Sequence, residues 1–154
     1  MKILITAFLI INLLLSSCIE QNGFTESVIV NTSSHDVRLL PYKNNAIDSE
    51  YIADISAHTQ TRVLFTSAGL GNIEPCYNST AASYDSVVFV YDVAVKIAHL
   101  PEQAPAYAHS IPASSPRSVM NGDNYYKTIR KKNNHRSEAT CSFTITEQDY
   151  LDAL

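Results

Sequence analysis

The chain has 154 residues, of which 45% are hydrophobic and 17% charged, and its formal net charge is −4. This composition excludes a disordered or fibrous chain, and the mildly acidic balance excludes a general attraction to nucleic acid. The length suits one domain, because a chain of this size buries roughly two-thirds of its unfolded surface around a single core.

The first 18 residues have the pattern of an export signal. Lys2 precedes an apolar run over residues 3–15, which is shorter than the ~20 apolar residues of a membrane-spanning helix. The segment Leu15-Ser16-Ser17-Cys18 then resembles the lipobox of bacterial lipoproteins. The resemblance implies that residues 1–17 are removed as a signal peptide and that Cys18 carries acyl chains, such as palmitate, that hold the protein in a membrane.

The residues after Cys18 complete the expected organisation. Residues 18–24 are expected to form a lipidated tether, and residues 25–154 a single β-rich domain. In the best-known sorting rule for such lipoproteins, an Asp directly after the cysteine retains the protein in the inner membrane. Ile19 stands there instead. We therefore expect a lipid-anchored protein of the cell envelope, in the outer membrane and facing the periplasm or the cell surface.

The first half of the domain predicts two pairs of strands. Residues 27–31 are rich in β-branched side chains, and residues 36–40 alternate before Pro41, so these two segments predict a first hairpin. Residues 50–55 and 61–65 predict a second pair of strands.

The middle of the chain predicts a central strand between two long loops. Residues 86–91 form the most continuous apolar run after the signal and are typical of a central strand, and residues 93–99 predict its neighbour. Residues 69–83 are irregular, and residues 101–118 carry four prolines and predict an extended loop. Both loops would be contact regions if they lie at one end of the domain.

The last third predicts a hairpin followed by a short helix. Residues 125–132 and 136–145 flank a pair of asparagines that tolerates a turn. Thr146 and Asp149 fit a capping box that would begin a helix running to Leu154. Seven or eight short strands predict a mainly β fold, an antiparallel β-sandwich or open barrel with a short C-terminal helix.

Two cysteines remain besides the lipidation candidate. Cys76 and Cys141 form an even pair in a chain expected to enter an oxidising compartment, so we expect a disulfide between them. Closing a loop of this length would stabilise the fold by ~4 kcal/mol in the chain-entropy model. The alternative is two unrelated thiols.

Several short motifs together resemble small uncharacterised bacterial outer-membrane lipoproteins with a lipobox signal and a β-rich domain. Besides the lipobox, the motifs are Val28-Ile29-Val30-Asn31, Asp36-Val37-Arg38-Leu39, Tyr84-Asp85-Ser86-Val87 and Phe143-Thr144-Ile145-Thr146-Glu147-Gln148-Asp149-Tyr150. The family has no established activity. The resemblance therefore implies a β-rich exported domain and no catalytic residue.

Metal and catalytic motifs are missing from the sequence. The five histidines lack metal-ligand spacing, and the nearest candidate is His99 with His109 and Glu102, for which surface histidines are the simpler interpretation. No Gly-x-Ser-x-Gly segment or glycine-rich phosphate loop occurs. We expect no metal, no cofactor and no catalytic constellation.

The candidate contact residues are Tyr107, His109, Arg130, Lys131 and Lys132. The basic run that contains the last three would bind anionic lipid head groups or an acidic partner, or would simply keep an edge strand from aggregating. Loop tyrosines give contact area at low entropic cost, or else cover the core.

These observations predict a non-enzymatic accessory or binding module, joined to the membrane through Cys18 and to a protein partner in the cell envelope. The first alternative is a small-ligand or glycan-binding protein that uses loop tyrosines. The second alternative is a hydrolase whose site is assembled across loops, which sequence order alone does not reveal.

Overall fold

The computed structural model describes residues 22–70, 76, 84–102, 109–133 and 136–154. Cys18, Tyr107 and most of the irregular stretch 69–83 lie outside these residues. The elements in chain order are β1 (Asn22–Asn31), β2 (Val37–Lys43), β3 (Ala46–Ile47), η1 (Ser49–Tyr51), β4 (Ala53–Ile55), β5 (Gln60–Leu70), β6 (Ser86–Tyr91), β7 (Val95–Leu100), β8 (Ser110–Pro112), η3 (Gly122–Asn124), β9 (Tyr126–Asn133), β10 (Arg136–Ile145) and α2 (Glu147–Ala153).

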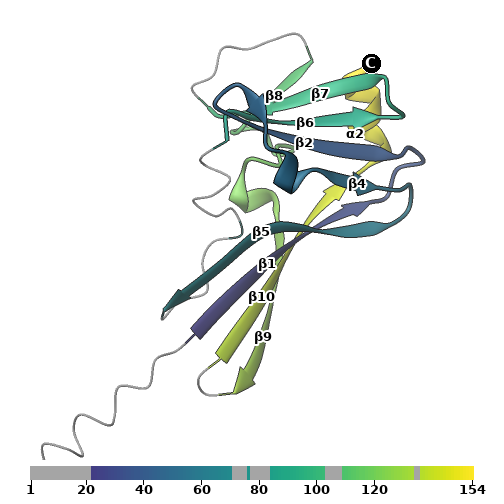
Figure 1. The fold of residues 1–154 in the computed structure, drawn as a ribbon. Helices are drawn as coiled ribbons and strands as arrows, with labels where there is room; N and C mark the ends of the chain where they lie inside the picture. Colours follow the sequence, from purple (N-terminus) through teal and green to yellow (C-terminus); the bar gives the residue numbers. More distant parts are fainter. Residues whose placement is uncertain (1–21, 71–75, 77–83, 103–108, 134–135) are drawn as a thin grey trace, which may run out of the picture.

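The fold is mainly β and sandwich-like, with one short C-terminal helix, as the sequence predicts. One sheet has the strand order β5-β1-β10-β9, and the other has the order β3-β2-β6-β7-β8 with β4 also paired to β2. Figure 1 shows the first sheet extending well beyond the second, toward the start of β1. Both sheets are mixed, because β1 pairs with β10 and β7 pairs with β8 in parallel.

The core lies between the two sheets. Ile29 and Phe143 of the four-stranded sheet meet Leu39 and Phe89 of the other, and all four are at most 4% exposed. The rings of Phe89 and Phe143 pack edge to face with their centroids 6.3 Å apart. Burial alternates along β2, so every second side chain of this strand points to the outer face. The last three residues of β6 are all buried, and Val90 among them is 7% exposed.

The local elements are close to the predicted ones. β6 has the bounds predicted for the central strand and lies in the middle of the order β3-β2-β6-β7-β8. β9 and β10 form the predicted hairpin. The Asp149 carboxylate accepts hydrogen bonds from the N–H and the hydroxyl of Thr146, both at 2.7 Å, so the predicted capping box begins α2. The disulfide between Cys76 and Cys141 is confirmed, with the two Cα atoms 5.3 Å apart.

The two strand pairs predicted for the first half are wrong. β1 pairs with β5 and β10, whereas β2 pairs with β3, β4 and β6, so the chain crosses between sheets after Asn31. β4 pairs with β2 and β5 pairs with β1, so these two segments do not form a pair either. The side chain of Asn31 holds the crossing in place, because its amide donates to the carbonyls of His35 and Ser56 at 2.8 and 3.2 Å.

Pro41 does not end β2, contrary to the prediction. The Pro41 carbonyl accepts a hydrogen bond from the N–H of Asp48 at 2.9 Å, on the side of β2 away from β6. The nitrogen and the carbonyl of one residue point to the same side of a strand, so the Pro41 nitrogen also points away from β6. On that side, Pro41 lies between the part of β2 that pairs with β4 and the part that pairs with β3. The missing N–H therefore costs no bond between β2 and β6.

The proline-rich segment 101–118 is not wholly irregular. Its described part contains β8, which pairs with the edge of β7. Ile111 of β8 is 8% exposed and belongs to the core. This part of the segment is therefore built into the fold.

Candidate functional site

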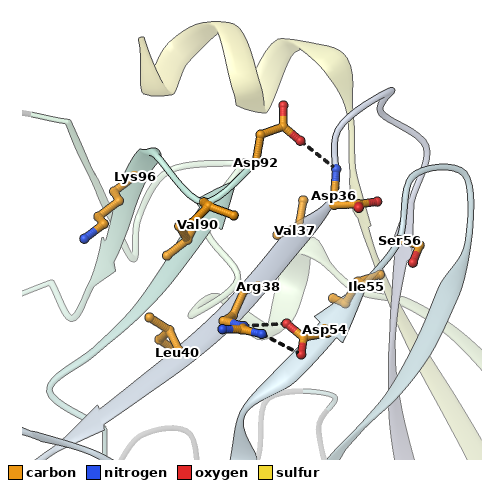
Figure 2. A pocket seen from close by; sticks show the side chains of 11 residues that line it. Asp36, Val37, Arg38, Leu40, Asp54, Ile55, Ser56, Val90, Asp92 and Lys96 are labelled. Carbon is orange, nitrogen blue, oxygen red and sulfur yellow. Dashed lines mark hydrogen bonds and ion pairs between the residues drawn. The ribbon is translucent and has the colours of Figure 1, made fainter.

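A groove of about 510 Å³ lies on the outer face of the six-stranded sheet. Strand pairing arranges its central residues in one row: Asp54 lies opposite Arg38, Arg38 opposite Val90, and Val90 opposite Lys96. Figure 2 shows Lys96 and Asp36 on opposite sides of the groove, with Val90 between them. The four side chains of this row face the groove because each is next to a core residue of its own strand.

Arg38 and Asp54 form an ion pair across β2 and β4 in the groove. The Arg38 Nε–Asp54 Oδ1 distance is 2.5 Å and the second nitrogen–oxygen distance is 3.0 Å, so the contact is bidentate. The hydrogen bonds from Arg38 hold the pKa of the Asp54 carboxyl below its usual value. Both side chains are more than half exposed, so the pair adds little stability but presents a fixed pattern of charge.

Lys96 supplies the second positive charge of the groove. It is exposed and forms no ion pair with any residue that the structure describes. Val90 lies between Lys96 and the Arg38–Asp54 pair, because it is opposite both Arg38 and Lys96, and the apolar side chain of Leu40 also lines the groove. The groove thus combines an apolar floor with charges of both signs at its rim.

The turn between β6 and β7 closes one end of the groove with a strained backbone. Asp92 and Val93 have φ angles of 46° and 73°, and Val93 is 91% exposed. Positive φ is rare for a β-branched residue and costs about 1–3 kcal/mol. The Asp92 carboxylate holds the turn, because its Oδ1 accepts from the N–H of Asp36 at 3.1 Å.

His35 joins this turn to the start of α2. Its Nδ1 lies 2.5 Å from Oδ2 of Asp92, and its Nε2 lies 3.1 Å from Oε1 of Glu147. The imidazole stacks on the ring of Tyr150, with the centroids 3.5 Å apart and an interplanar angle of 16°. The hydrogen bond to Asp92 and the charge of that carboxylate, followed by the hydrogen bond to Glu147, raise the pKa of His35 above 6.5. Because carboxylates occupy both ring nitrogens, His35 orders the rim of the groove and has no free nitrogen to act as a base.

The other predicted histidine candidates do not converge on a site. His99 is 1% exposed on β7, whereas His109 is exposed and precedes β8. The N–H of Val119 donates to His99 Nδ1 at 3.2 Å, and burial lowers the pKa of His99 to about 4. Across the part of the chain that the structure describes, no three His, Cys, Asp or Glu side chains are placed to hold a metal ion.

The predicted contact residues lie in different sheets. His109 lies beside β8 at the edge of the six-stranded sheet, and Arg130 is exposed on β9 at the edge of the other. Tyr126 is 76% exposed on β9 and does not line the groove. The groove and the contacts of His35 were missed, because they join residues far apart in the sequence.

Comparison of the chain with protein-family models, curated proteins and solved structures finds no match. No helix among the described residues combines the length and the apolar character needed to cross a bilayer.

Proposed function

We propose that this chain is a lipid-anchored binding module of the bacterial cell envelope, and that the groove on the six-stranded sheet receives its partner. The signal pattern that ends at Cys18 supports the location. The observation that carries the binding role is the groove itself, in which an apolar floor is surrounded by charges of both signs.

The chemistry of the groove suits a short segment of another protein. Val90 and Leu40 offer apolar area for one or two side chains of a partner. Lys96 is free to pair with an acidic side chain, whereas Arg38 already has both carboxylate oxygens of Asp54 as acceptors. The expected partner segment therefore carries an apolar residue next to an Asp or Glu.

The groove also lies far from the proposed anchor. β1 has ten residues, so at ~3.3 Å per residue its two ends are ~30 Å apart. The loop with His35 and Asp36 follows the far end of β1, and this loop borders the groove. A partner in the envelope can therefore approach the groove without entering the membrane.

Site-specific photo-crosslinking in cells tests this proposal. A photoreactive residue at Val93 or at Lys96 should crosslink to one partner, whereas the same residue at Thr128, exposed on β9, should not. Mass spectrometry of the crosslinked peptide should identify a segment with an acidic residue. Equal crosslinking at Thr128, or a crosslinked segment without acidic residues, would contradict the proposal.

A matched pair of charge changes adds a second test. Lys96→Glu places a negative charge beside the expected acidic side chain and should reduce crosslinking at Val93 several-fold. Lys43→Glu makes the same change at an exposed position of β2 that does not line the groove, and it should have no effect.

The volume of the groove favours one second candidate, a small-ligand binder, since small-molecule sites commonly enclose about 300–1,000 Å³. A small ligand here would carry both an apolar part and a carboxylate for Lys96. Amide NMR shifts of the purified protein distinguish the two candidates. A small ligand shifts signals of β6 and β7 without any protein partner, whereas the accessory module responds only to its partner segment.

A further inference from the structure

The topology of the four-stranded sheet brings the densest basic segment next to the proposed lipid anchor. β1 and β10 run in parallel with Asn22 opposite Arg136, and β10 returns from β9 with Arg136 opposite Asn133. The start of β1, the start of β10 and the end of β9 therefore lie at one end of the sheet, which Figure 1 shows projecting beyond the second sheet. We call the backbone positions Asn22–Phe24, Arg130–Asn133 and Arg136–Glu138 the basic end.

Positive charge is concentrated at the basic end. Four residues there are basic, and Glu138 is the one acidic residue among these positions. Arg130 lies in the same row as Phe24 and Glu138, two residues from Asn22 along the sheet. Its side chain is exposed and forms no ion pair with any described residue. At ~3.3 Å per residue, Arg130 is ~7 Å from the row of Asn22, Arg136 and Asn133 at the end of the sheet. This distance is within one Debye length at physiological salt.

The opposite end of the molecule is acidic. Acidic residues outnumber basic ones there: Asp36, Asp54 and Asp92 border the groove with Arg38 and Lys96, and Glu147, Asp149 and Asp152 lie on α2, where Arg117 pairs with the last two. The chain as a whole carries a formal net charge of −4, so the basic end is a local exception and the charge is polarised along β1. A negatively charged surface attracts one end of such a molecule and repels the other.

The length of the chain between Cys18 and Asn22 restricts where this sheet can sit. Cys18 lies four residues before Asn22, so an extended chain spans at most ~14 Å between them. A lipid on Cys18 would hold Asn22, and with it the row of Asn133 and Arg136, within that distance of the membrane surface.

We propose that the basic end binds the anionic head groups of the membrane that holds the lipid anchor. The domain then stands upright on its four-stranded sheet and presents the groove away from the bilayer. This inference rests on the anchoring at Cys18 in the proposed function, but the two can fail separately. Each basic residue near an anionic surface favours the bound orientation about fivefold, so removing three of them weakens it about a hundredfold at low salt.

The chain has no tryptophan, so a single introduced tryptophan can report the orientation. Full-length acylated protein with Asn133→Trp at the basic end, or with Val93→Trp at the groove, is placed in vesicles containing brominated lipids. Vesicles with about a third of anionic lipid should quench the fluorescence at position 133 and leave position 93 unquenched. Neutral vesicles should quench position 133 much less, and ~1 M salt should remove the difference, because the Debye length falls to ~3 Å.

Charge variants in the Asn133→Trp background test the residues. The triple change Arg130→Gln, Lys131→Gln and Lys132→Gln should abolish the quenching, while the protein stays acylated and membrane-bound. The triple change Arg130→Lys, Lys131→Arg and Lys132→Arg keeps the charge and should keep the quenching, which separates loss of charge from damage to the hairpin.

The mass of the N-terminal peptide separates the two proposals. Acylated protein whose quenching at position 133 is absent, or equal with neutral and anionic vesicles, would overturn this inference and leave the anchor intact. Protein without acyl chains on Cys18 would overturn the anchoring and this inference with it.

Discussion

Acidification should destabilise this protein through one buried histidine. His99 is 1% exposed and packs against the ring of Phe89, with the centroids 4.6 Å apart. Its Nδ1 accepts from the N–H of Val119, so its proton is on Nε2 and the neutral form is the one that the core accommodates. Burial lowers the pKa of this imidazole from 6.5 to about 4.

The sign and the size of the effect follow from this pKa. Between pH 6.5 and about pH 4 the unfolded chain binds a proton on His99 that the folded protein does not, so the free energy of unfolding falls as the pH falls. At 1.36 kcal/mol per pH unit the full loss is about 3 kcal/mol, a large part of the 5–15 kcal/mol typical of a domain. The contribution is complete above pH 6.5.

Urea unfolding of wild type and of His99→Gln at pH 7 and at pH 4 measures this contribution. Glutamine can still accept from Val119 and takes up no proton, so comparing the two pH values cancels the direct cost of the substitution. Wild type should lose about 3 kcal/mol more than the variant on acidification. Equal losses in the two proteins would refute the reasoning.

Three further outcomes are expected. The imidazole of His35 should titrate in NMR with a midpoint above pH 6.5, and Asp92→Asn should lower this midpoint; a wild-type midpoint below 6.5 would contradict the hydrogen-bond argument. The contribution of His35 to stability is present at low pH and is lost as the pH rises through the midpoint. Replacing Cys76 and Cys141 with serine should lower the free energy of urea unfolding by ~4 kcal/mol, and reduction of the wild type should match it. Val93→Gly should raise that free energy by about 1 kcal/mol, because glycine adopts positive φ without strain; a less stable variant would show that the turn is relaxed.

Short-range patterns in the sequence were sufficient for the individual elements. The apolar run of β6, the flanked asparagines of the last hairpin and the capping box of Thr146 and Asp149 each involve neighbouring residues, and the structure contains all three. The mainly β fold and the disulfide follow from the same kind of evidence. Such features depend on side-chain alternation and local hydrogen bonds, which the order of residues specifies directly.

The pairing of the strands could not be predicted in the same way. Alternation along residues 27–31 indicates a strand with one buried face, but it is equally compatible with β2 or β10 as the neighbour. Pro41 looked like the end of a strand because its missing N–H matters only on one side, and that side depends on which strands flank β2.

The candidate site was hidden for a related reason. His35 contacts Asp92 and Glu147, which are 57 and 112 residues away in the chain. Asp92 follows the predicted strand 86–91, and nothing near it in sequence indicates a histidine partner. The groove arises because four strands present their outward residues side by side, and this cannot be inferred before the order of the strands is known.

The parallel pairing of β1 with β10 also determines when the protein can fold. The two central strands of the four-stranded sheet are the first and the last strands described, so the middle of this sheet cannot form until synthesis has passed Ile145. Until then β1 can pair only with β5, and its other edge stays open to unintended partners. Contacts between such distant segments slow folding. A nascent chain of this protein therefore remains incompletely folded until β10 has been synthesised.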